Sequence, residues 1–569
     1  MNQGELNILI GGPAGAGIEK TGRLMTLSFV RSGYYVFGNV EHMSLIRGGN
    51  NFLRVRVGEA PHECHVEKIN VMIALDKTTI EEHANEVVEG GVIIYDGENI
   101  RLDGIDTGKA KMLDIPLKNL ANEELENPVM ANTIALGALF GVVGFDLKDF
   151  NEVVAKVFAH KSAEIVKLNE KAAKIGYELA PKGDDTIERK DGKNMFLMGN
   201  DAFTLGAIKA GCKFVGAYPM TPSSTVLHMM AKWSKDYGIV VKHTEDEIAA
   251  AGSIVGAGYA GVRALTCTSG GGFALMTEMV GLAGMLEVPC VFVNVMRPGP
   301  ATGQPTRTEA GDLRQAIHSG QGDPIKIVLV PGTVQDCFEM GFEAFNLAEK
   351  YQLPVIVTYD KSLGEGYFTV PPFEDDEIKV DRGKLLTQSE LDKIDTYRRY
   401  LQTEDGISPR TIPGMKGGTH RATSDEHNEK GEIFEGAENR GLMMEKRMGK
   451  LVEALEDLPG PKVWGEEEAD LTLVTWNSTT LACKEAADIL VNEGRKVNVI
   501  QIRTAYPFHA KEVAELLGKA KKLVAVEMNY TAQMAGLIAE NTGIKIDEKI
   551  LKYDGRPMTA QYIIESLKV

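Results

Sequence analysis

Runs of consecutive apolar residues, rather than alternating ones, mark the middle of this 569-residue chain. From Met195 to about Val370 these runs read FVGAY, RALTCT, VPCVFVNVM, IKIVLV and LPVIVTY. A strand that is apolar at every position is buried on both faces, as in a parallel sheet covered by helices. The pattern therefore predicts an open, parallel α/β domain over residues 195–370.

The first 180 residues carry a related pattern. The opening stretch ELNILIGGPAGAGIEKTGRLMTLSFVRSGYYVFG reads as strand, glycine-rich turn, helix and second strand, which is the beginning of a βαβ fold. Further strands are expected at Asn70–Leu75 and Gly91–Tyr95, with a helix near Val129–Val143. We expect a Rossmann-like domain over residues 1–180, followed by a polar linker at 181–194.

Residues 371–462 interrupt the α/β pattern. They are rich in charge, contain GISPRTIPGMKGGTH and few apolar positions, and predict an extended insert that ends in a helix at Met443–Glu456. Strand-like runs return in DLTLVTWN, KVNVIQI and KLVAVEMN. A third α/β domain is expected over residues 463–569, so the predicted fold class is α/β with several open sheets.

The charge and the cysteine spacing of the chain argue against several classes of protein. A net charge of −18 argues against nucleic-acid binding, which needs a basic face. The six cysteines are widely spaced and form no CxxC pair, so no zinc ribbon or ferredoxin-type cluster can be built from near neighbours. Neither a signal peptide nor an apolar run of membrane-spanning length is evident, and we expect a cytoplasmic protein.

Two possible sites in the first domain carry weak signals. The turn Gly11–Gly17 lies where dinucleotide folds hold a pyrophosphate, but Glu19 precedes Lys20-Thr21 where a P-loop needs glycine. A phosphate-containing ligand and tight strand–helix packing both remain open for this turn. The stretch His62–His65 holds three potential metal ligands, but adjacent residues rarely converge on one ion, so no metal site is predicted.

Three polar side chains follow strands of the middle domain. Thr221 lies in AYPMTPSSTV, where two prolines stiffen the turn. Glu247 stands just before a helix of small residues, and a buried carboxylate there must be paired or protonated, which suits proton exchange with a ligand nitrogen. Arg297 ends a strand, and guanidinium binds a carboxylate bidentately.

Each of these side chains also has an ordinary structural explanation. The turn at Thr221 resembles a strand-to-helix turn with a serine cap, Glu245 and Asp246 suit the dipole of a helix start, and an arginine often forms a surface ion pair. Because ligands of open parallel sheets bind at the carboxyl ends of the strands, the shared position favours a common crevice. We therefore expect hydroxyl, carboxylate and guanidinium to share one site.

The order of motifs resembles the alpha subunit of 2-oxoacid:ferredoxin oxidoreductases with the gamma domain fused at its N-terminus. The resemblance covers essentially the whole chain and rests on GGPAGAGIEKTG, SLIRGGNN, YPMTPSS, EDEIAAAGSIVGAGYAG, TSGGGFALMTE, and RPGPATGQPT with GDL. It implies a gamma domain at 1–180, a thiamine-diphosphate pyrimidine-binding domain at 195–370 and a transketolase C-terminal-like domain at 463–569. The insert is similar to the type that acts on 2-oxoglutarate.

The same resemblance implies roles for the three side chains. Glu247 matches the catalytic glutamate that binds the aminopyrimidine of the cofactor and favours its imino tautomer. Thr221 and Arg297 match residues that bind the substrate, with the arginine on its carboxylate. Where many relatives have QRGGPSTG, this chain has MRPGPATG, so Ala301 lacks a serine hydroxyl and the distal substrate contacts differ.

Cofactors and partners follow from the family in the same way. The chain lacks a G-D-G…N signature for diphosphate and metal. The resemblance therefore implies a beta subunit that shares the thiamine diphosphate and carries Mg²⁺ and a [4Fe-4S] cluster, in an (αβ)2 heterotetramer that uses coenzyme A and ferredoxin. Two alternatives stay open: a broad-specificity or pyruvate-type subunit, and a non-catalytic nucleotide- or coenzyme-binding protein.

Overall fold

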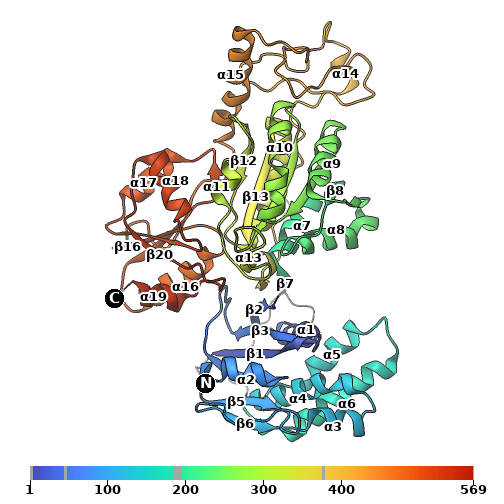
Figure 1. The fold of residues 1–569 in the computed structure, drawn as a ribbon, viewed down its shortest axis with the longest axis vertical. Helices are drawn as coiled ribbons and strands as arrows, with labels where there is room; N and C mark the ends of the chain where they lie inside the picture. The colour runs from blue at the N-terminus through green and yellow to red at the C-terminus, as the bar shows by residue number, and fades with distance from the viewer. Residues whose placement is uncertain (1–3, 44–47, 185–193, 375–377, 568–569) are drawn as a thin grey trace. The chain divides into compact units, whose positions relative to one another are not determined.

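The structure is a computed structural model that describes residues 4–43, 48–184, 194–374 and 378–567. It divides into two compact units, Met1–Leu197 with Gly366–Pro372, and Met198–Glu365 with Phe373–Val569 (Figure 1). Most of the expected linker at 181–194, and residues 44–47 of SLIRGGNN, lie outside the described residues. Among the helices described, none has the length and apolar character needed to cross a membrane.

An eight-stranded sheet is the centre of the first unit, in the order β6-β5-β4-β1-β3-β2-β14-β7. Its strands are β1 (Glu5–Ala14), β2 (Tyr35–Glu41), β3 (Gly48–Gly58), β4 (Ile69–Ala74), β5 (Val87–Tyr95), β6 (Lys111–Asp114), β7 (Met195–Met198) and β14 (Tyr367–Val370). Its helices are α1 (Ile18–Arg31), α2 (Lys77–His83), α3 (Leu117–Glu123), α4 (Ala131–Val143), α5 (Leu147–Val157) and α6 (Ala163–Leu179), with short 3-10 turns at Ala84–Glu86 and Pro128–Met130. The strands and the helix expected from the sequence form within a few residues of their predicted positions.

The first two strands do not pair as a simple βαβ unit would pair them. β3 lies between β1 and β2 and is antiparallel to both. Only residues 42–47 connect β2 to β3, and a parallel crossover needs about a dozen residues, so the chain returns antiparallel. Leu53, Val55 and Val57 of β3 are buried, which fixes the register of this strand in the sheet.

The strand β14 returns to the first sheet from late in the chain. It pairs antiparallel with β2, and the Tyr367 ring stacks on Phe196 with centroids 5.5 Å apart. The Thr369 hydroxyl donates to the carbonyl oxygen of Val36 and accepts from its amide. Residues 366–372, which the apolar pattern groups with the middle domain, therefore belong to the first unit.

The second unit contains a seven-stranded sheet in the order β18-β12-β13-β11-β10-β8-β9. Its strands are β8 (Phe214–Ala217), β9 (Val240–His243), β10 (Ala264–Thr268), β11 (Cys290–Met296), β12 (Ile327–Leu329), β13 (Pro354–Asp360) and β18 (Thr504–Tyr506). All pairings are parallel except that of β18 with β12. Every residue of β11 and β13 is buried, which confirms the covered parallel sheet that the apolar runs predict.

One helix, α7, precedes the first strand of this sheet in the chain, and the other helices follow its strands. The helices are α7 (Gly199–Lys209), α8 (Ser224–Tyr237), α9 (Glu247–Tyr259), α10 (Gly270–Met285), α11 (Leu313–Ile317), α12 (Val334–Tyr351) and α13 (Lys361–Glu365). Figure 1 shows α9 and α10 beside the strands in the green region of the chain. This arrangement sets the starts of α8, α9 and α10 at one edge of the sheet.

A five-stranded sheet completes the second unit, in the order β15-β17-β16-β19-β20. Its elements are β15 (Lys462–Trp464), β16 (Leu471–Thr475), α16 (Thr479–Asn492), β17 (Val497–Gln501), α17 (Ala510–Gly518), β19 (Leu523–Glu527), α18 (Gln533–Thr542), β20 (Glu548–Leu551) and α19 (Ala560–Ser566). β15 is an antiparallel edge strand and the other pairings are parallel. The third α/β sheet expected from the sequence is present.

The insert between the two sheets of the second unit is largely irregular, as its composition predicts. It contains α14 (Gln388–Leu391) and α15 (Ala437–Ala454), which both lie at the top of Figure 1. The helix α15 begins six residues before the expected Met443, because residues 437–442 are polar but mostly compatible with a helix.

Buried ion pairs connect this insert to residues in the domain of the seven-stranded sheet. The fully buried carboxylate of Glu287 accepts hydrogen bonds from Lys446 at 2.7 Å and from Lys450. The Arg399 guanidinium donates to the Glu287 carbonyl oxygen at 2.7 Å. A second buried carboxylate, Glu349, pairs with three arginines, Arg263, Arg382 and Arg410. Each of these two buried carboxylates thus forms ion pairs with more than one cationic side chain.

Candidate active site

The predicted site residues lie at one edge of the seven-stranded sheet. Thr221 follows β8, Glu247 begins α9 after the edge strand β9, and Arg297 follows β11. β8 lies between β9 and β10, and β11 lies beside β10. Because parallel strands present their carboxyl ends at the same edge, these loops are neighbours in space. The short strand β9 was not predicted from the sequence.

A direct hydrogen bond joins the first and third of these loops. The Nη1 atom of Arg297 donates to the backbone carbonyl oxygen of Thr221 at 2.7 Å. Arg297 is half-buried, and this burial lowers the pKa of its guanidinium, while the nearby Asp312 carboxylate opposes the shift. The structure therefore brings Arg297 and Thr221 together, with Arg297 keeping further N–H donors for a ligand.

The turn at Thr221 differs from a strand-to-helix turn with a serine cap. Residues 218–220 leave β8 without regular structure, and Thr221 begins a tight turn into α8. The hydroxyl of Ser223 donates to the carbonyl oxygen of Met220 at 2.7 Å and forms no cap bond to the helix. Thr221 is a half-buried residue at the edge of the sheet.

Glu247 and its neighbour Asp246 have different surroundings. Asp246 caps α9, because its carboxylate accepts the amide of Ala249 at 2.7 Å, so its structural explanation holds. Glu247 is only 5% exposed. Among the residues that the structure describes, its carboxylate has no hydrogen-bond or ion-pair partner. A buried carboxylate in this state favours a ligand as its partner.

A glycine at the start of α10 makes room for the Glu247 side chain. A Cβ at Gly272 would lie 2.8 Å from Cγ of Glu247 and 2.1 Å from Oγ1 of Thr268. Any side chain at this position would displace both groups. The motif TSGGG therefore contributes a packing requirement to the site, and sequence reasoning did not identify Gly272 or Thr268 as part of it.

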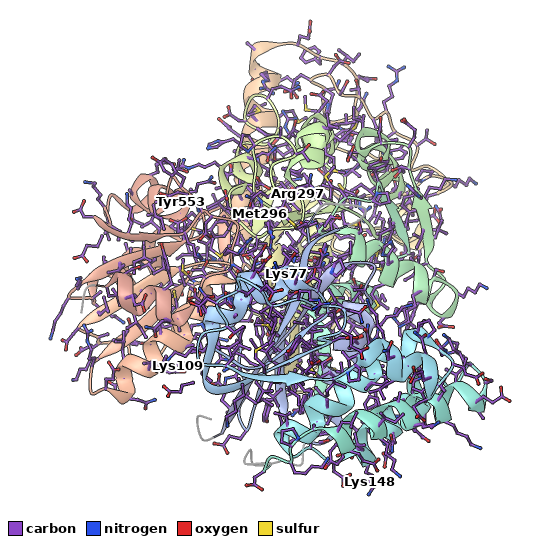
Figure 2. The ribbon with its side chains drawn as sticks, turned by 60° about the horizontal axis from the view of Figure 1, so that its bottom comes forward. Lys77, Lys109, Lys148, Met296, Arg297 and Tyr553 are labelled. Atoms are coloured by element: carbon purple, nitrogen blue, oxygen red, sulfur yellow. The ribbon has the colours of Figure 1, made fainter. Side chains whose placement is uncertain are left out.

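A cavity of about 750 Å³ opens beside Arg297. Its walls come from the start of α10, the loop after β11, the segment 309–315 and the C-terminal sheet domain. Figure 2 labels Arg297, Met296 at the end of β11, and Tyr553, which lines the cavity from the C-terminal sheet domain. Ala301 also lines this cavity.

Two carboxyl groups in this cavity were missed by sequence reasoning. Burial raises the pKa of Asp312 to about 6, while a hydrogen bond from Asn294 and the charge of Arg297 oppose the increase. Burial, Asp312 and Asp554 raise the pKa of Glu309 to about 7. The motif GDL contains Asp312, but nothing in one sequence shows that Glu309 faces the same cavity.

The cysteines are structural in the described residues. All six are buried. Burial raises the pKa of several of their thiols, to about 12 for Cys212, Cys267 and Cys483. Within the described ranges, no cluster of three histidine, cysteine or carboxylate side chains is arranged to hold a metal ion. A buried thiol that resists ionisation is a poor metal ligand.

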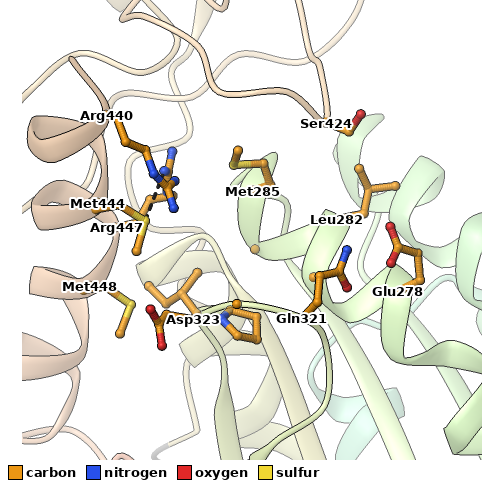
Figure 3. A pocket seen from close by; sticks show the side chains of 15 residues that line it. Glu278, Leu282, Met285, Gln321, Asp323, Ser424, Arg440, Met444, Arg447 and Met448 are labelled. Carbon is orange, nitrogen blue, oxygen red and sulfur yellow. Dashed lines mark hydrogen bonds between the residues drawn. The ribbon is translucent and has the colours of Figure 1, made fainter. Parts of the chain in front are cut away.

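A second cavity of about 200 Å³ lies apart from these residues (Figure 3). It is lined by the end of α10, the loop 321–325 and α15. Its two arginines, Arg440 and Arg447, both pair with Glu426, which lowers the pKa of that carboxyl against the effect of its burial. No residue predicted for the site lines this cavity.

The glycine turn of the first unit is closely packed. A Cβ at Gly11 would lie 2.5 Å from Cγ2 of Thr79, and one at Gly12 would lie 2.9 Å from Cβ of Leu75. The side-chain amide of Asn132 donates a hydrogen bond to the backbone carbonyl oxygen of Ala16 at 2.7 Å. These contacts support tight packing as one role of the turn.

Family models match three parts of the chain. The models described as "Pyruvate ferredoxin/flavodoxin oxidoreductase", "Pyruvate flavodoxin/ferredoxin oxidoreductase, thiamine diP-bdg" and "Pyruvate:ferredoxin oxidoreductase core domain II" match residues 7–179, 205–446 and 469–563. All three site residues fall within the second match.

Individual proteins match the chain over most of its length. The 2-oxoacid:ferredoxin oxidoreductase subunit alpha of Sulfolobus sp is 32% identical, over 99% of this chain and 96% of that protein. The 2-oxoglutarate synthase subunit KorA of Methanothermobacter marburgensis is 34% identical over 59% of this chain and 88% of its own length. A solved structure, the 2-oxoglutarate:ferredoxin oxidoreductase of Magnetococcus marinus with 2-oxoglutarate, coenzyme A and succinyl-CoA bound, is 33% identical with a TM-score of 0.92. It covers 100% of this chain and 99% of its own.

Proposed function

Because this chain belongs to the 2-oxoacid:ferredoxin oxidoreductases, as an alpha subunit, we propose that its substrate is 2-oxoglutarate. The reaction is the coenzyme A-dependent oxidative decarboxylation of the 2-oxoacid to acyl-CoA and CO2, with electrons passing to ferredoxin, or its reverse. The full-length likeness to the Magnetococcus marinus enzyme carries this proposal. The match to a 2-oxoglutarate synthase subunit supports it.

Glu247 is the residue proposed to hold the aminopyrimidine of thiamine diphosphate. The fit is good, because the carboxylate is buried, lacks a partner in the described structure and lies in space kept open by Gly272. When bound, this cofactor would supply the nucleophilic carbon for decarboxylation of the 2-oxoacid. The protonated carboxyl of Glu247 would donate a hydrogen bond to a nitrogen of the pyrimidine ring, and transfer of that proton to the ring would favour the imino tautomer.

Arg297 and Thr221 are proposed to bind the substrate. The guanidinium of Arg297 pairs with the carboxylate next to the 2-oxo group, and the Thr221 hydroxyl donates to the same end of the molecule. The hydrogen bond from Arg297 to the Thr221 carbonyl holds the two groups together before substrate arrives. Such positioning avoids an ordering cost when the complex forms.

A beta subunit is proposed to cover this edge of the sheet. Large apolar side chains next to the site face solvent: Tyr218 is 39% exposed, Ile248 46% and Leu275 52%. They flank Thr221, Glu247 and Gly272 along the chain. An exposed apolar rim around a polar site is typical of a subunit interface. The partner would carry Mg²⁺ and a [4Fe-4S] cluster, in an (αβ)2 assembly in the cytoplasm.

Broad specificity for 2-oxoacids is the second candidate. The full-length relative from Sulfolobus sp is named for 2-oxoacids in general, and the family models are named for pyruvate enzymes. An enzyme that acts on 2-oxoglutarate needs a contact for the second carboxylate of its substrate, whereas an enzyme that acts on pyruvate needs no such contact. Substrate preference therefore separates the two candidates.

The test measures ferredoxin or viologen reduction by this chain purified with its partner subunit. Coenzyme A is supplied with either 2-oxoglutarate or pyruvate. We expect strong turnover of 2-oxoglutarate and weak turnover of pyruvate. Equal turnover would favour the broad-specificity candidate, and no turnover with thiamine diphosphate and clusters present would contradict the proposed function.

A further inference from the structure

The segment that carries Glu309 is fixed firmly to the C-terminal sheet domain. The amide of Ala310 donates to the carbonyl oxygen of Met528 at 2.8 Å, and the side chain of Asn529 donates to the carbonyl oxygen of Ala310 at 3.2 Å. The side chain of Gln533 donates to the carbonyl oxygen of Gly311 at 2.6 Å. These bonds hold the backbone on one side while Glu309 lines the Arg297 cavity.

The charged groups that line the cavity beside Glu309 are unbalanced. Asp312 lines the same cavity. Asp554, which belongs to the C-terminal sheet domain, raises the pKa of Glu309. Arg297 is the cation in the cavity wall, and its charge acts on Asp312. With both lining carboxyl groups ionised, the cavity wall carries two negative charges and one positive charge. The hydroxyls of Tyr530 and Tyr553 complete the titratable groups of this wall.

A dicarboxylate substrate makes this imbalance important. One carboxylate of the substrate binds Arg297. The second carboxylate must lie in the rest of the cavity, near the negatively charged carboxyl groups of the wall. Like charges in a partly buried site repel, whereas a protonated carboxyl donates a hydrogen bond to a carboxylate. The protonation state of a lining acid therefore changes the affinity for a second carboxylate more than the affinity for the first.

We propose that Glu309 is the residue that sets the preference of the cavity between dicarboxylate and monocarboxylate 2-oxoacids, an inference that rests on the proposed function. Protonated Glu309 donates a hydrogen bond to the second carboxylate of the substrate. Ionised Glu309 repels that carboxylate and leaves a monocarboxylate little affected. With its pKa near 7, Glu309 exchanges between these forms at neutral pH.

The first experiment compares kcat/KM for 2-oxoglutarate and for pyruvate between pH 6 and 8.5, using the complex with its partner. In the wild type, the ratio of the two values falls by about tenfold as pH rises, the change expected from one added like charge. Glu309→Gln cannot ionise, so its ratio loses the fall around pH 7 and retains only the smaller change toward pH 6 that Asp312 contributes. Glu309→Asp retains the pH dependence, and the exposed control Glu493→Gln behaves as the wild type.

The second experiment measures binding without turnover, so that it separates this inference from the proposed function. Glutarate is titrated calorimetrically at pH 7 in buffers of different ionisation enthalpy, with butyrate as the monocarboxylate control. Wild type takes up a fraction of a proton with glutarate, and Glu309→Gln takes up a clearly smaller fraction, the part that belongs to Asp312. Unchanged proton uptake or an unchanged pH slope in Glu309→Gln would overturn the inference. Failure of wild type to bind glutarate at pH 6 would also overturn it.

Discussion

The guanidinium of Arg297 donates a hydrogen bond of 2.7 Å to the backbone carbonyl oxygen of Thr221. These residues are 76 positions apart in the chain, and each follows a strand of the same parallel sheet. This bond uses one of the five N–H donors of the guanidinium. It therefore orients the group and leaves the other donors available to a ligand. A side chain fixed in this way is suited to bind a planar carboxylate.

Replacement of Arg297 by lysine tests this geometry. Lysine keeps the positive charge but loses the fixed fork of donors and the bond to Thr221. We expect kcat/KM for the 2-oxoacid to fall by about 10- to 100-fold, mainly through a higher KM. Steady-state kinetics of Arg314→Lys provides the control, because Arg314 forms an ion pair with the exposed Glu540. Equal kinetics for both variants would show that Arg297 does not bind substrate.

Gly272→Ala tests whether the space beside Glu247 matters. The new Cβ would lie 2.1 Å from Oγ1 of Thr268 and 2.8 Å from Cγ of Glu247, so these groups must move. A displacement of about 1 Å at a reacting group lowers the rate by about 100-fold, and we expect a loss of that order. Gly281→Ala lies in the same helix, where the nearest atom would be 4.0 Å away, and is expected to retain activity. A fully active Gly272→Ala enzyme would contradict the role given to this space.

The buried cluster at Glu287 makes a prediction about stability. Glu287→Gln leaves Lys446 and Lys450 fully buried without their carboxylate, and loss of one partner from a buried pair costs about 3–5 kcal/mol. Lys450→Met removes one cation but keeps the Lys446–Glu287 pair, so its effect on the free energy of unfolding should be clearly smaller. Urea unfolding of the two variants measures this difference. The reverse order of stabilities would contradict this account of the cluster.

The apolar rim makes a prediction about assembly. Leu275→Glu places a charge in the surface where a beta subunit is proposed to pack, and desolvation of that charge opposes association. We expect the variant chain to lose its partner in co-purification while keeping its own circular dichroism spectrum. Val452→Glu is the control, since Val452 is also exposed but lies on α15. Retention of the partner by Leu275→Glu would place the interface elsewhere.

Much of the fold followed from local pattern. Fully apolar strands such as β11 and β13 predict a buried parallel sheet because no other position in a domain excludes water from both faces. The antiparallel insertion of β3 and the return of β14 were not predicted. The return of β14 depends on pairing over a long sequence distance, which leaves little trace in a single sequence. β3 follows β2 closely, but it was not recognised as a strand between β1 and β2.

The shared sheet edge of the candidate residues was predictable from the sequence, whereas the packing around them was not. Thr221, Glu247 and Arg297 follow strands and belong to recognisable motifs, so their shared edge could be expected. The need for glycine at position 272 arises from a side chain 25 residues earlier, and only the structure reveals that contact. Glu309 is similar, because its position in the cavity depends on backbone bonds to residues near 530.

The most direct test of the central claim measures ferredoxin reduction by Glu247→Gln in the purified complex with 2-oxoglutarate and coenzyme A. The amide keeps the shape of the side chain but cannot hold the proton, so kcat should fall by about 100-fold or more. Glu245→Gln changes an exposed carboxylate two residues away and should match the wild type. Full activity of Glu247→Gln, with thiamine diphosphate bound, would contradict the assignment of this buried carboxylate to the reaction.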